Sequence, residues 1–300
     1  MAKRPDTQYL ITERINPRTR HLDKCSPLEI IELISEEDKK VAEAVARQKR
    51  NIARAVDLIV SRLRRGGRLF FVGAGTSGRL GVIEAAECPP TFGTHPGLIQ
   101  GVIAGGKKAL WRSIEGAEDS TNGAKKVLTK LRLGERDIVI GIAASATTSF
   151  VLGALSYAKK KGSARVLITC NPINSQLANI NISLFVGPEV ISGSTRMKAG
   201  TATKMVLNML TTASMVRLGK TYGNLMVDVQ PNSNKLRIRA RRIVMQILGA
   251  DPKRVDSLLK KSNWDVKVAI LMGMKNLGYK EAKERLSRCD GFLQEALKSK

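Results

Sequence analysis

Aromatic residues are scarce in this 300-residue chain, at 4% of the sequence, and this scarcity bears on its partners. The formal net charge is +25, a balance that nucleic-acid-binding proteins often carry. Proteins that hold single strands place aromatic side chains among the basic ones, so that bases can stack on them. The basic residues here are spread along the chain without such aromatics. We therefore expect a lysine-rich surface and no nucleic-acid partner.

Histidine and cysteine are also few, which excludes the common metal sites. The two histidines are His21 and His95, and no two of the four cysteines stand at metal-ligand spacing. We therefore expect no metal ion. The cysteines are Cys25, Cys88, Cys170 and Cys289.

Long apolar runs are missing as well. The sequence has no uninterrupted apolar stretch of about eighteen residues, so we expect no membrane span and no membrane partner. The start Met1-Ala-Lys-Arg-Pro has no apolar run behind its charges and does not resemble a signal peptide. Together with unpaired cysteines, these absences predict a cytoplasmic protein.

What the chain does contain is a series of short apolar segments that alternate with helical patterns. Continuous apolar strands separated by helices are typical of a parallel sheet covered on both faces, so the expected fold class is α/β. Five strands are expected, over residues 68–72, 98–103, 137–144, 165–170 and 182–186.

The helical patterns divide the chain further. Ser35, followed by three acids, predicts a helix start, and the glycine pair at 66–67 ends that helix. Further helices are expected over 198–218 and 236–248, with three short helices after Ala250. The predicted organisation is therefore an N-terminal arm, an α/β domain and a small C-terminal helical domain. Their boundaries are 1–27, 28–248 and 249–300.

Three loops rich in glycine, serine and threonine follow strands of the predicted sheet. Ligands of open parallel sheets bind beyond the carboxyl ends of the strands. Hydroxyls and free backbone N–H groups at helix starts suit a phosphate there, and Lys198 or Arg196 could neutralise it. The candidate hydroxyl residues are Thr76 and Ser77 in the first loop, Ser145 in the second, and Ser194 and Thr195 in the third.

The first loop, Gly73–Gly78, also has the spacing of a dinucleotide-binding turn, which alone is a weak signal. Such a fold places an acid at the end of the next strand to hold a ribose. That strand instead ends Ile103-Ala104-Gly105-Gly106. The three hydroxyl loops therefore favour a phosphorylated sugar over a nicotinamide cofactor.

Two carboxylates are candidates for proton transfer. Glu87 stands before Pro89-Pro90, which we expect to end a helix, and Glu118 lies in a turn. Paired carboxylates can divide acid and base work when their surroundings separate their pKa values. From spacing alone, both also fit solvated surface acids or helix-cap partners.

Several segments resemble one known family, the N-acetylmuramic acid 6-phosphate etherases, from about Thr12 to the end of the chain. Two of them are Gly73-Ala-Gly-Thr-Ser-Gly-Arg-Leu-Gly81 and Glu87-Cys-Pro-Pro90-Thr-Phe-Gly93. The others are 103–106, 115–119, 141–145, 187–190, 193–201 and 222–228.

This resemblance implies a sugar-isomerase (SIS) fold, related to the glucokinase regulatory protein, followed by a helical domain similar to ubiquitin-associated (UBA) folds. It implies cleavage of the D-lactyl ether of N-acetylmuramic acid 6-phosphate to N-acetylglucosamine 6-phosphate and D-lactate, in cell-wall sugar recycling. It also implies no metal or organic cofactor, and a homodimer with its site at the subunit boundary. Glu87 would protonate the departing lactyl oxygen, and Glu118 would activate water.

One loop departs from the family pattern. The family usually continues the loop after the third strand as Ala-Ser-Gly-Arg-Thr-Pro, whereas this chain has residues 144–149 as Ala-Ser-Ala-Thr-Thr-Ser. Replacing arginine by threonine removes a fixed fork of hydrogen-bond donors. An altered substrate, or a regulator that binds a phosphosugar without cleaving it, therefore remains an alternative to the etherase.

Overall fold

The computed structural model describes residues 10–172 and 175–299, which form two compact units. The first unit comprises Met1–Ala86 and Gly97–Thr211, and the second comprises Glu87–Pro96 and Thr212–Lys300. The first nine residues of the predicted arm lie outside the described residues. The domain boundaries expected at 27/28 and 248/249 stay predictions, since the two units are defined by packing alone.

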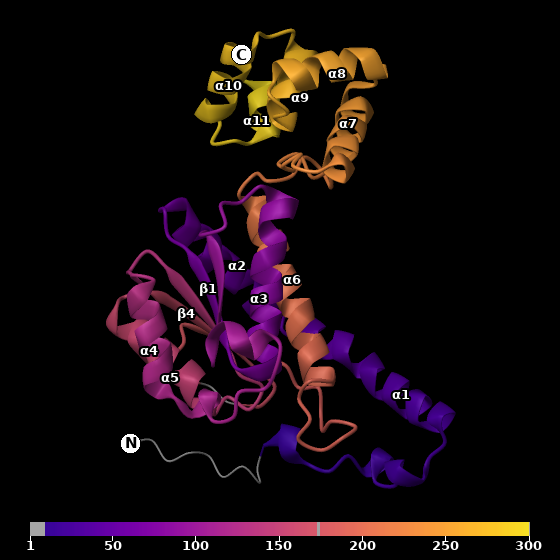
Figure 1. Ribbon diagram of the computed structural model, residues 1–300, viewed down its shortest axis with the longest axis vertical. Helices are drawn as coiled ribbons and strands as arrows, with labels where there is room; N and C mark the ends of the chain where they lie inside the picture. Colours follow the sequence, from indigo (N-terminus) through magenta and orange to yellow (C-terminus); the bar gives the residue numbers. More distant parts are fainter. Residues whose placement is uncertain (1–9, 173–174, 300) are drawn as a thin grey trace. The chain divides into compact units, whose positions relative to one another are not determined.

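The first unit is built on a parallel sheet of five strands, which confirms the predicted fold class (Figure 1). The strand order is β2-β1-β3-β4-β5, so β2 lies on one side of β1, and the later strands are added on its other side. The fifth strand begins and ends earlier than the predicted 182–186. The strands are β1 Leu69–Gly73, β2 Ile99–Ile103, β3 Ile138–Ile142, β4 Ala164–Thr169 and β5 Ile180–Ser183.

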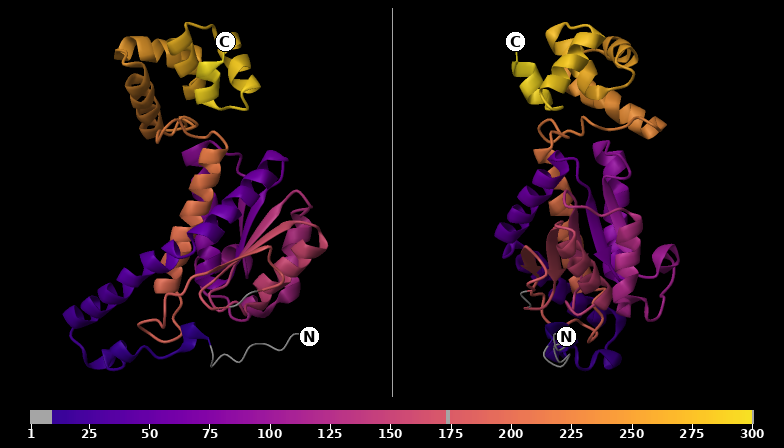
Figure 2. Two further views of the ribbon diagram at one scale, coloured as in Figure 1. Left: turned by 180° about the vertical axis from the view of Figure 1, so that it is seen from behind. Right: turned by 90° about the vertical axis from the view of Figure 1, so that its left-hand side faces the viewer.

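Helices cover both faces of this sheet (Figures 1 and 2). One face packs on α4 (Thr121–Lys130) and α5 (Ser149–Lys160), and this layer contains the buried Phe70. The next side chain along β1, Phe71, points to the other face, where α3 (Gly75–Phe92) approaches closely. Successive side chains of a strand face opposite ways, so the all-apolar run of β1 serves both layers.

The N-terminal helices begin and end at other residues than predicted. Helix α1 (Pro27–Ala46) starts after Ser26, not at Ser35. Ser26 accepts a hydrogen bond from the Glu29 backbone, and the Glu29 carboxylate accepts one from the Ser26 backbone. This reciprocal cap, with proline at the first helical position, defines the start better than the later serine. The expected single helix is in fact two, since α2 (Lys49–Arg64) follows a break.

Short 3₁₀ turns and one long helix complete the first unit. The described part of the predicted arm, from residue 10 onward, contains three such turns, η2 (Ile11–Glu13), η3 (Pro17–Thr19) and η4 (Leu22–Lys24). Two more lie between β2 and α4, at η5 (Gly106–Leu110) and η6 (Ala117–Asp119). The helix expected over 198–218 is confirmed as α6, Lys198–Arg217, whose last turns belong to the second unit.

The second unit is helical, as predicted, although four helices follow Gly249 where three were expected. Its central helix α9 is buried on nearly all sides, and contacts α7, α8, α10 and α11. A helix that is apolar all round is stable only when neighbours surround it. These helices are α7 Asn234–Leu248, α8 Pro252–Lys261, α9 Val266–Lys275, α10 Tyr279–Arg288 and α11 Leu293–Lys298.

Within the described residues, no helix is both long and apolar enough to cross a bilayer. The same part of the chain has no group of three or more histidine, cysteine, aspartate or glutamate side chains that could hold a metal ion.

Candidate active site

A cavity of about 310 Å³ lies at the carboxyl ends of β1 and β3 in the first unit. The register aligns Gly73 of β1 with Ile142 of β3, so the loops that follow these strands lie side by side. The volume is at the lower end of the range for small-molecule sites, which suits a monosaccharide phosphate. The lining residues are Glu13, Ala74, Gly75, Thr76, Ser77, Ser113, Glu118, Ala144, Ser145, Thr148, Gly193 and Thr195.

The first hydroxyl loop turns from β1 into α3 without any spacer. A Cβ atom on Gly73 would lie 2.6 Å from the Gly78 backbone nitrogen, and one on Gly78 would lie 2.7 Å from the Gly73 carbonyl oxygen. Only glycine permits this approach of strand and helix. The N–H groups of the first turn of a helix have no partner within that helix, so Thr76 and Ser77 offer both N–H and hydroxyl donors at the cavity.

The second hydroxyl loop has an unusual backbone at the position where the sequence departs from the family pattern. Ala146 has φ +60°, a left-handed conformation that side chains other than glycine rarely adopt. The Ser145 hydroxyl accepts from the Thr147 backbone at 3.2 Å and from its hydroxyl at 2.8 Å. Thr148 precedes α5 and lines the cavity. Alanine therefore adopts here a backbone conformation that glycine would accommodate more easily.

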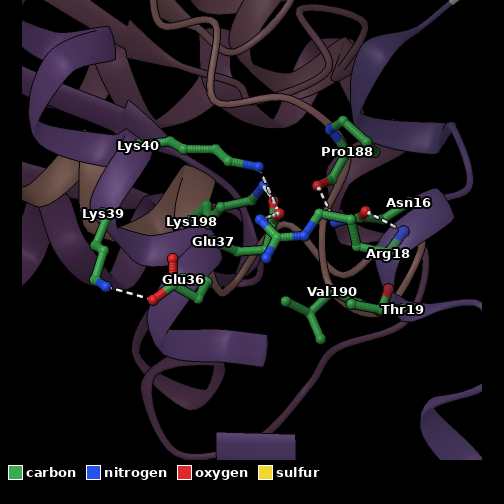
Figure 3. Close-up of polar contacts among 10 residues, drawn as sticks. All are labelled: Asn16, Arg18, Thr19, Glu36, Glu37, Lys39, Lys40, Pro188, Val190 and Lys198. Carbon is green, nitrogen blue, oxygen red and sulfur yellow. Dashed lines mark hydrogen bonds and ion pairs between the residues drawn. The ribbon is translucent and has the colours of Figure 1, made fainter. Parts of the chain in front are cut away.

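The third hydroxyl loop contributes Thr195 to the cavity but not Ser194 or Lys198. The Lys198 amine is 1% exposed and forms an ion pair with Glu37 of α1, which is 2% exposed (Figure 3). Lys40 donates to the same carboxylate. The structure therefore does not bring Lys198 to the cavity, where we expected it to neutralise a phosphate.

The start of α6 is also occupied, which corrects the expectation that all three loops present free N–H groups. The buried Glu189 carboxylate accepts from the backbone N–H groups of Lys198 at 3.0 Å and Ala199 at 2.9 Å. Burial raises the pKa of Glu189, although these two hydrogen bonds oppose the rise. Of the three hydroxyl loops, those before α3 and α5 are therefore the candidates for binding an anion at a helix start.

The charge of the cavity is acidic. Its lining includes two carboxylates, Glu13 and Glu118, and no lysine or arginine among the described residues. A phosphate here would be held by hydroxyl and N–H donors, without a basic side chain from the part of the chain that the structure describes. Charge-neutral donors at helix starts can do this, because the helix dipole adds to the hydrogen bonds.

Of the two predicted carboxylates, Glu118 lines the cavity and Glu87 does not. Glu118, in the turn η6, lines the cavity. Glu87 is an exposed residue of α3. The expectation that the two prolines end this helix is wrong, because α3 continues through Pro89 and Pro90 to Phe92. The final turn is held by Gly93, whose backbone N–H donates to the Pro89 carbonyl at 3.0 Å.

Three lining residues with polar side chains were not among the predicted site residues: Glu13, Ser113 and Thr148. Thr148 belongs to a recognised hydroxyl loop and could have been included. Ser113 lies five residues before Glu118, a predicted site residue that also lines the cavity. Glu13 comes from the N-terminal arm, sixty residues before the start of the first hydroxyl loop at Gly73. Its sequence surroundings carry no signal of a cavity.

Several curated proteins are similar to this chain over nearly its whole length, and two of them share one enzyme name. The chain is 51% identical over 291 residues to the N-acetylmuramic acid 6-phosphate etherase of Clostridium botulinum strain Okra, covering 96% of each chain. It is 48% identical to the etherase of the same name from Geobacillus thermodenitrificans, covering 97% of this chain and 99% of that one.

Two further similarities concern the sheet domain. A family model described as the glucokinase regulatory protein N-terminal SIS domain matches residues 51–159. A phosphoheptose isomerase structure from Francisella tularensis superposes with a TM-score of 0.49 and 16% identity, covering 64% of this chain and 100% of that one.

Proposed function

The chain belongs to the family of N-acetylmuramic acid 6-phosphate etherases, and from this membership we propose its reaction, the residues that carry it and its assembly. It cleaves the ether bond of N-acetylmuramic acid 6-phosphate. As finer detail, we propose a carbon–oxygen lyase that yields D-lactate and N-acetylglucosamine 6-phosphate, in cytoplasmic recycling of cell-wall sugar. The observation that carries this proposal is 51% identity over 96% of both chains.

The proposed reaction has two halves that balance to addition of one water molecule. In the open-chain sugar, the C1 aldehyde makes the C2 proton acidic. A base removes this proton, the C3–oxygen bond breaks, and the electron pair forms a C2=C3 double bond. The lactyl oxygen leaves with a proton. Water then adds its hydroxyl to C3 and a proton returns to C2, which gives N-acetylglucosamine 6-phosphate.

Proton transfers in both halves need acids and bases close to C2 and C3, and each such group contributes about 10²- to 10⁴-fold. We propose that Glu87 protonates the departing lactyl oxygen and that Glu118 takes the proton from water. The position of Glu118 in the cavity lining supports its role. For Glu87, support comes from the matching segment Glu87–Gly93 and from its exposed side chain.

We propose that the phosphate is held by the hydroxyl loops. Thr76 and Ser77 at the start of α3 supply hydroxyl and N–H donors, and Ser145 and Thr195 supply further hydroxyls from neighbouring loops. Their convergence on one cavity supports this arrangement. Ser194 is half-buried beside Thr195 and has no place in the cavity lining.

The decisive experiment is to incubate the purified protein with N-acetylmuramic acid 6-phosphate and measure D-lactate. Release of D-lactate is expected, and Glu87→Gln should abolish it while substrate still binds. Glu118→Gln should instead let the unsaturated aldehyde accumulate, because water addition is slowed. A chain that binds the sugar phosphate tightly but releases no lactate would refute the etherase.

That refuting outcome would favour a second function, a phosphosugar-binding regulator. Two observations make it the alternative: the match of residues 51–159 to the regulatory-protein model, and the changed loop at 144–149. A regulator would bind the sugar phosphate with the same hydroxyl loops. It would release no D-lactate, with or without the Glu87→Gln or Glu118→Gln substitution.

We also propose a homodimer with the site at the subunit boundary. The exposed apolar side chains of Leu28 and Ile31 on α1 support a protein partner there. Neither Glu87→Gln nor Glu118→Gln should form N-acetylglucosamine 6-phosphate efficiently, so mixing the two variants and measuring formation of this product tests whether subunits share sites. If one site takes Glu87 and Glu118 from different subunits, hybrid dimers should restore roughly a quarter of wild-type activity. No recovery, in subunits shown to exchange, would contradict a shared site.

A further inference from the structure

Glu13 brings a second carboxylate to the cavity from the N-terminal arm. The residue lines the cavity together with Glu118. A Cβ atom on Gly193, which has φ +77°, would lie 3.1 Å from the Glu13 Oε2 atom. Within residues 10–172 and 175–299, no ion pair or hydrogen bond engages the Glu13 carboxylate. With respect to these described residues, the carboxylate is therefore available to accept a hydrogen bond beside the hydroxyl loops.

The backbone around Glu13 is fastened to the third hydroxyl loop. The Gly193 backbone N–H donates to the Thr12 carbonyl at 3.1 Å, and the Ser192 hydroxyl donates to the Glu13 carbonyl at 3.0 Å. Further along the arm, the Thr19 hydroxyl donates to the Val190 carbonyl at 2.8 Å. These hydrogen bonds therefore fix the position of the arm relative to this loop.

A second set of hydrogen bonds, made by the Asn171 side chain, joins the arm to the strand ends. Asn171 follows β4 and is fully buried. Its side-chain oxygen accepts from the Ile11 backbone at 2.6 Å, and its side-chain nitrogen donates to the Thr12 hydroxyl at 3.1 Å and to the Ala144 carbonyl at 2.8 Å. Ala144 itself lines the cavity. A single buried amide thus holds the residues next to Glu13 against the second hydroxyl loop.

The chemistry of a carboxylate decides what Glu13 can recognise. An ionised carboxylate only accepts hydrogen bonds, so it repels a phosphate and attracts hydroxyl or amide N–H donors. The hydroxyl loops already supply donors for the phosphate. An amino sugar phosphate offers the opposite groups on its ring, namely hydroxyls and an acetamido N–H.

We propose that Glu13 is a substrate-binding residue whose carboxylate accepts a hydrogen bond from a hydroxyl or N–H donor of the sugar. This inference rests on the proposed phosphosugar site. Glu13 gives the site polarity, because an acceptor near the sugar and donors near the phosphate allow one orientation of the ligand. The N-terminal arm is therefore part of the binding site as well as part of the fold.

The test compares two ligands on one variant. We would measure dissociation constants of N-acetylglucosamine 6-phosphate and of inorganic phosphate by ³¹P NMR titration, for wild type and Glu13→Gln. A hydrogen bond to a charged group corresponds to about 10- to 100-fold in affinity, so the sugar phosphate should bind that much more weakly. Inorganic phosphate should bind equally or more tightly, because a repelling charge is gone.

Asp23→Asn is the matched control, since Asp23 is an exposed acid of the same arm and does not line the cavity. It should leave both constants unchanged. Equal weakening of both ligands by Glu13→Gln would mean that the arm only supports the fold, and would overturn the proposal. So would unchanged binding of the sugar phosphate. Failure of the wild type to bind the sugar phosphate would overturn the proposed function, and this inference with it.

Discussion

Replacing Glu37 by glutamine should strongly destabilise the first unit, because it removes the counter-charge of a buried lysine amine. Glu37 is 2% exposed and Lys198 is 1% exposed, so neither charge has access to water (Figure 3). Breaking a buried pair by removing one partner typically costs about 3–5 kcal/mol. For a unit of roughly 200 residues this corresponds to a fall in Tm of about 6–20 °C.

The pH dependence gives the same prediction an independent check. Burial of Glu37 acts to raise its pKa, but the hydrogen bonds from Lys198 and Lys40 outweigh it, so the pKa is lowered. A carboxyl group with a lowered folded pKa stabilises the protein above its unfolded pKa, about 4.3 for glutamate, and loses this contribution as the pH falls through the folded pKa. The difference between wild type and Glu37→Gln should therefore be full at pH 7 and shrink below about pH 4.3.

Denaturant unfolding followed by circular dichroism measures this difference. Glu36→Gln is the control, because the neighbouring Glu36 pairs with Lys39 on the exposed side of the same helix. It should hardly change the midpoint. The double variant Glu37→Leu with Lys198→Met should be more stable than Glu37→Gln alone, since no charge stays buried. Equal midpoints for Glu36→Gln and Glu37→Gln at pH 7 would refute the reasoning.

Three further predictions concern other parts of the chain. Ala146→Gly should raise the free energy of unfolding by about 0.5–1 kcal/mol, because glycine relieves the left-handed backbone; a lower value in urea titration would contradict this. Iodoacetamide at pH 8 should label Cys25 and Cys289 in the native protein but not Cys170, whose pKa burial raises to about 12; mass spectrometry of labelled peptides decides. Asp228→Asn should destabilise the second unit by about 3 kcal/mol, because the buried amine of Lys267, 2.8 Å from the Asp228 carboxylate, loses its ion-pair partner; unchanged thermal unfolding would argue against it.

The main elements could be predicted because their signals are local. Each strand is a short apolar run between turns, and each hydroxyl loop follows such a run directly. The parallel sheet then follows, since strands buried on both faces need helices between them. The start of α1 was misplaced because two serine signals compete, and the reciprocal cap at Ser26 and Glu29 prevails.

The candidate site could be predicted only where its residues belong to the loops at strand ends. Thr76, Ser77 and Ser145 follow strands, and the shared edge of a parallel sheet brings them together. Lys198 has the charge and the position for phosphate binding, yet its amine pairs with Glu37, 161 residues earlier. A sequence pattern does not specify which opposite charge an amine will meet.

The sequence by itself determined the α/β class, the order of the strands along the chain, the three hydroxyl loops and the membership of the family. These depend on residue spacing, on short apolar runs and on similarity to the family over most of the chain, all of which can be recognised in the amino-acid sequence. The tertiary structure alone decided that Glu189 occupies the start of α6 and that Glu13 reaches the cavity. Such contacts join distant segments, and their free energy depends on burial and on approach in space, which spacing along the chain does not encode.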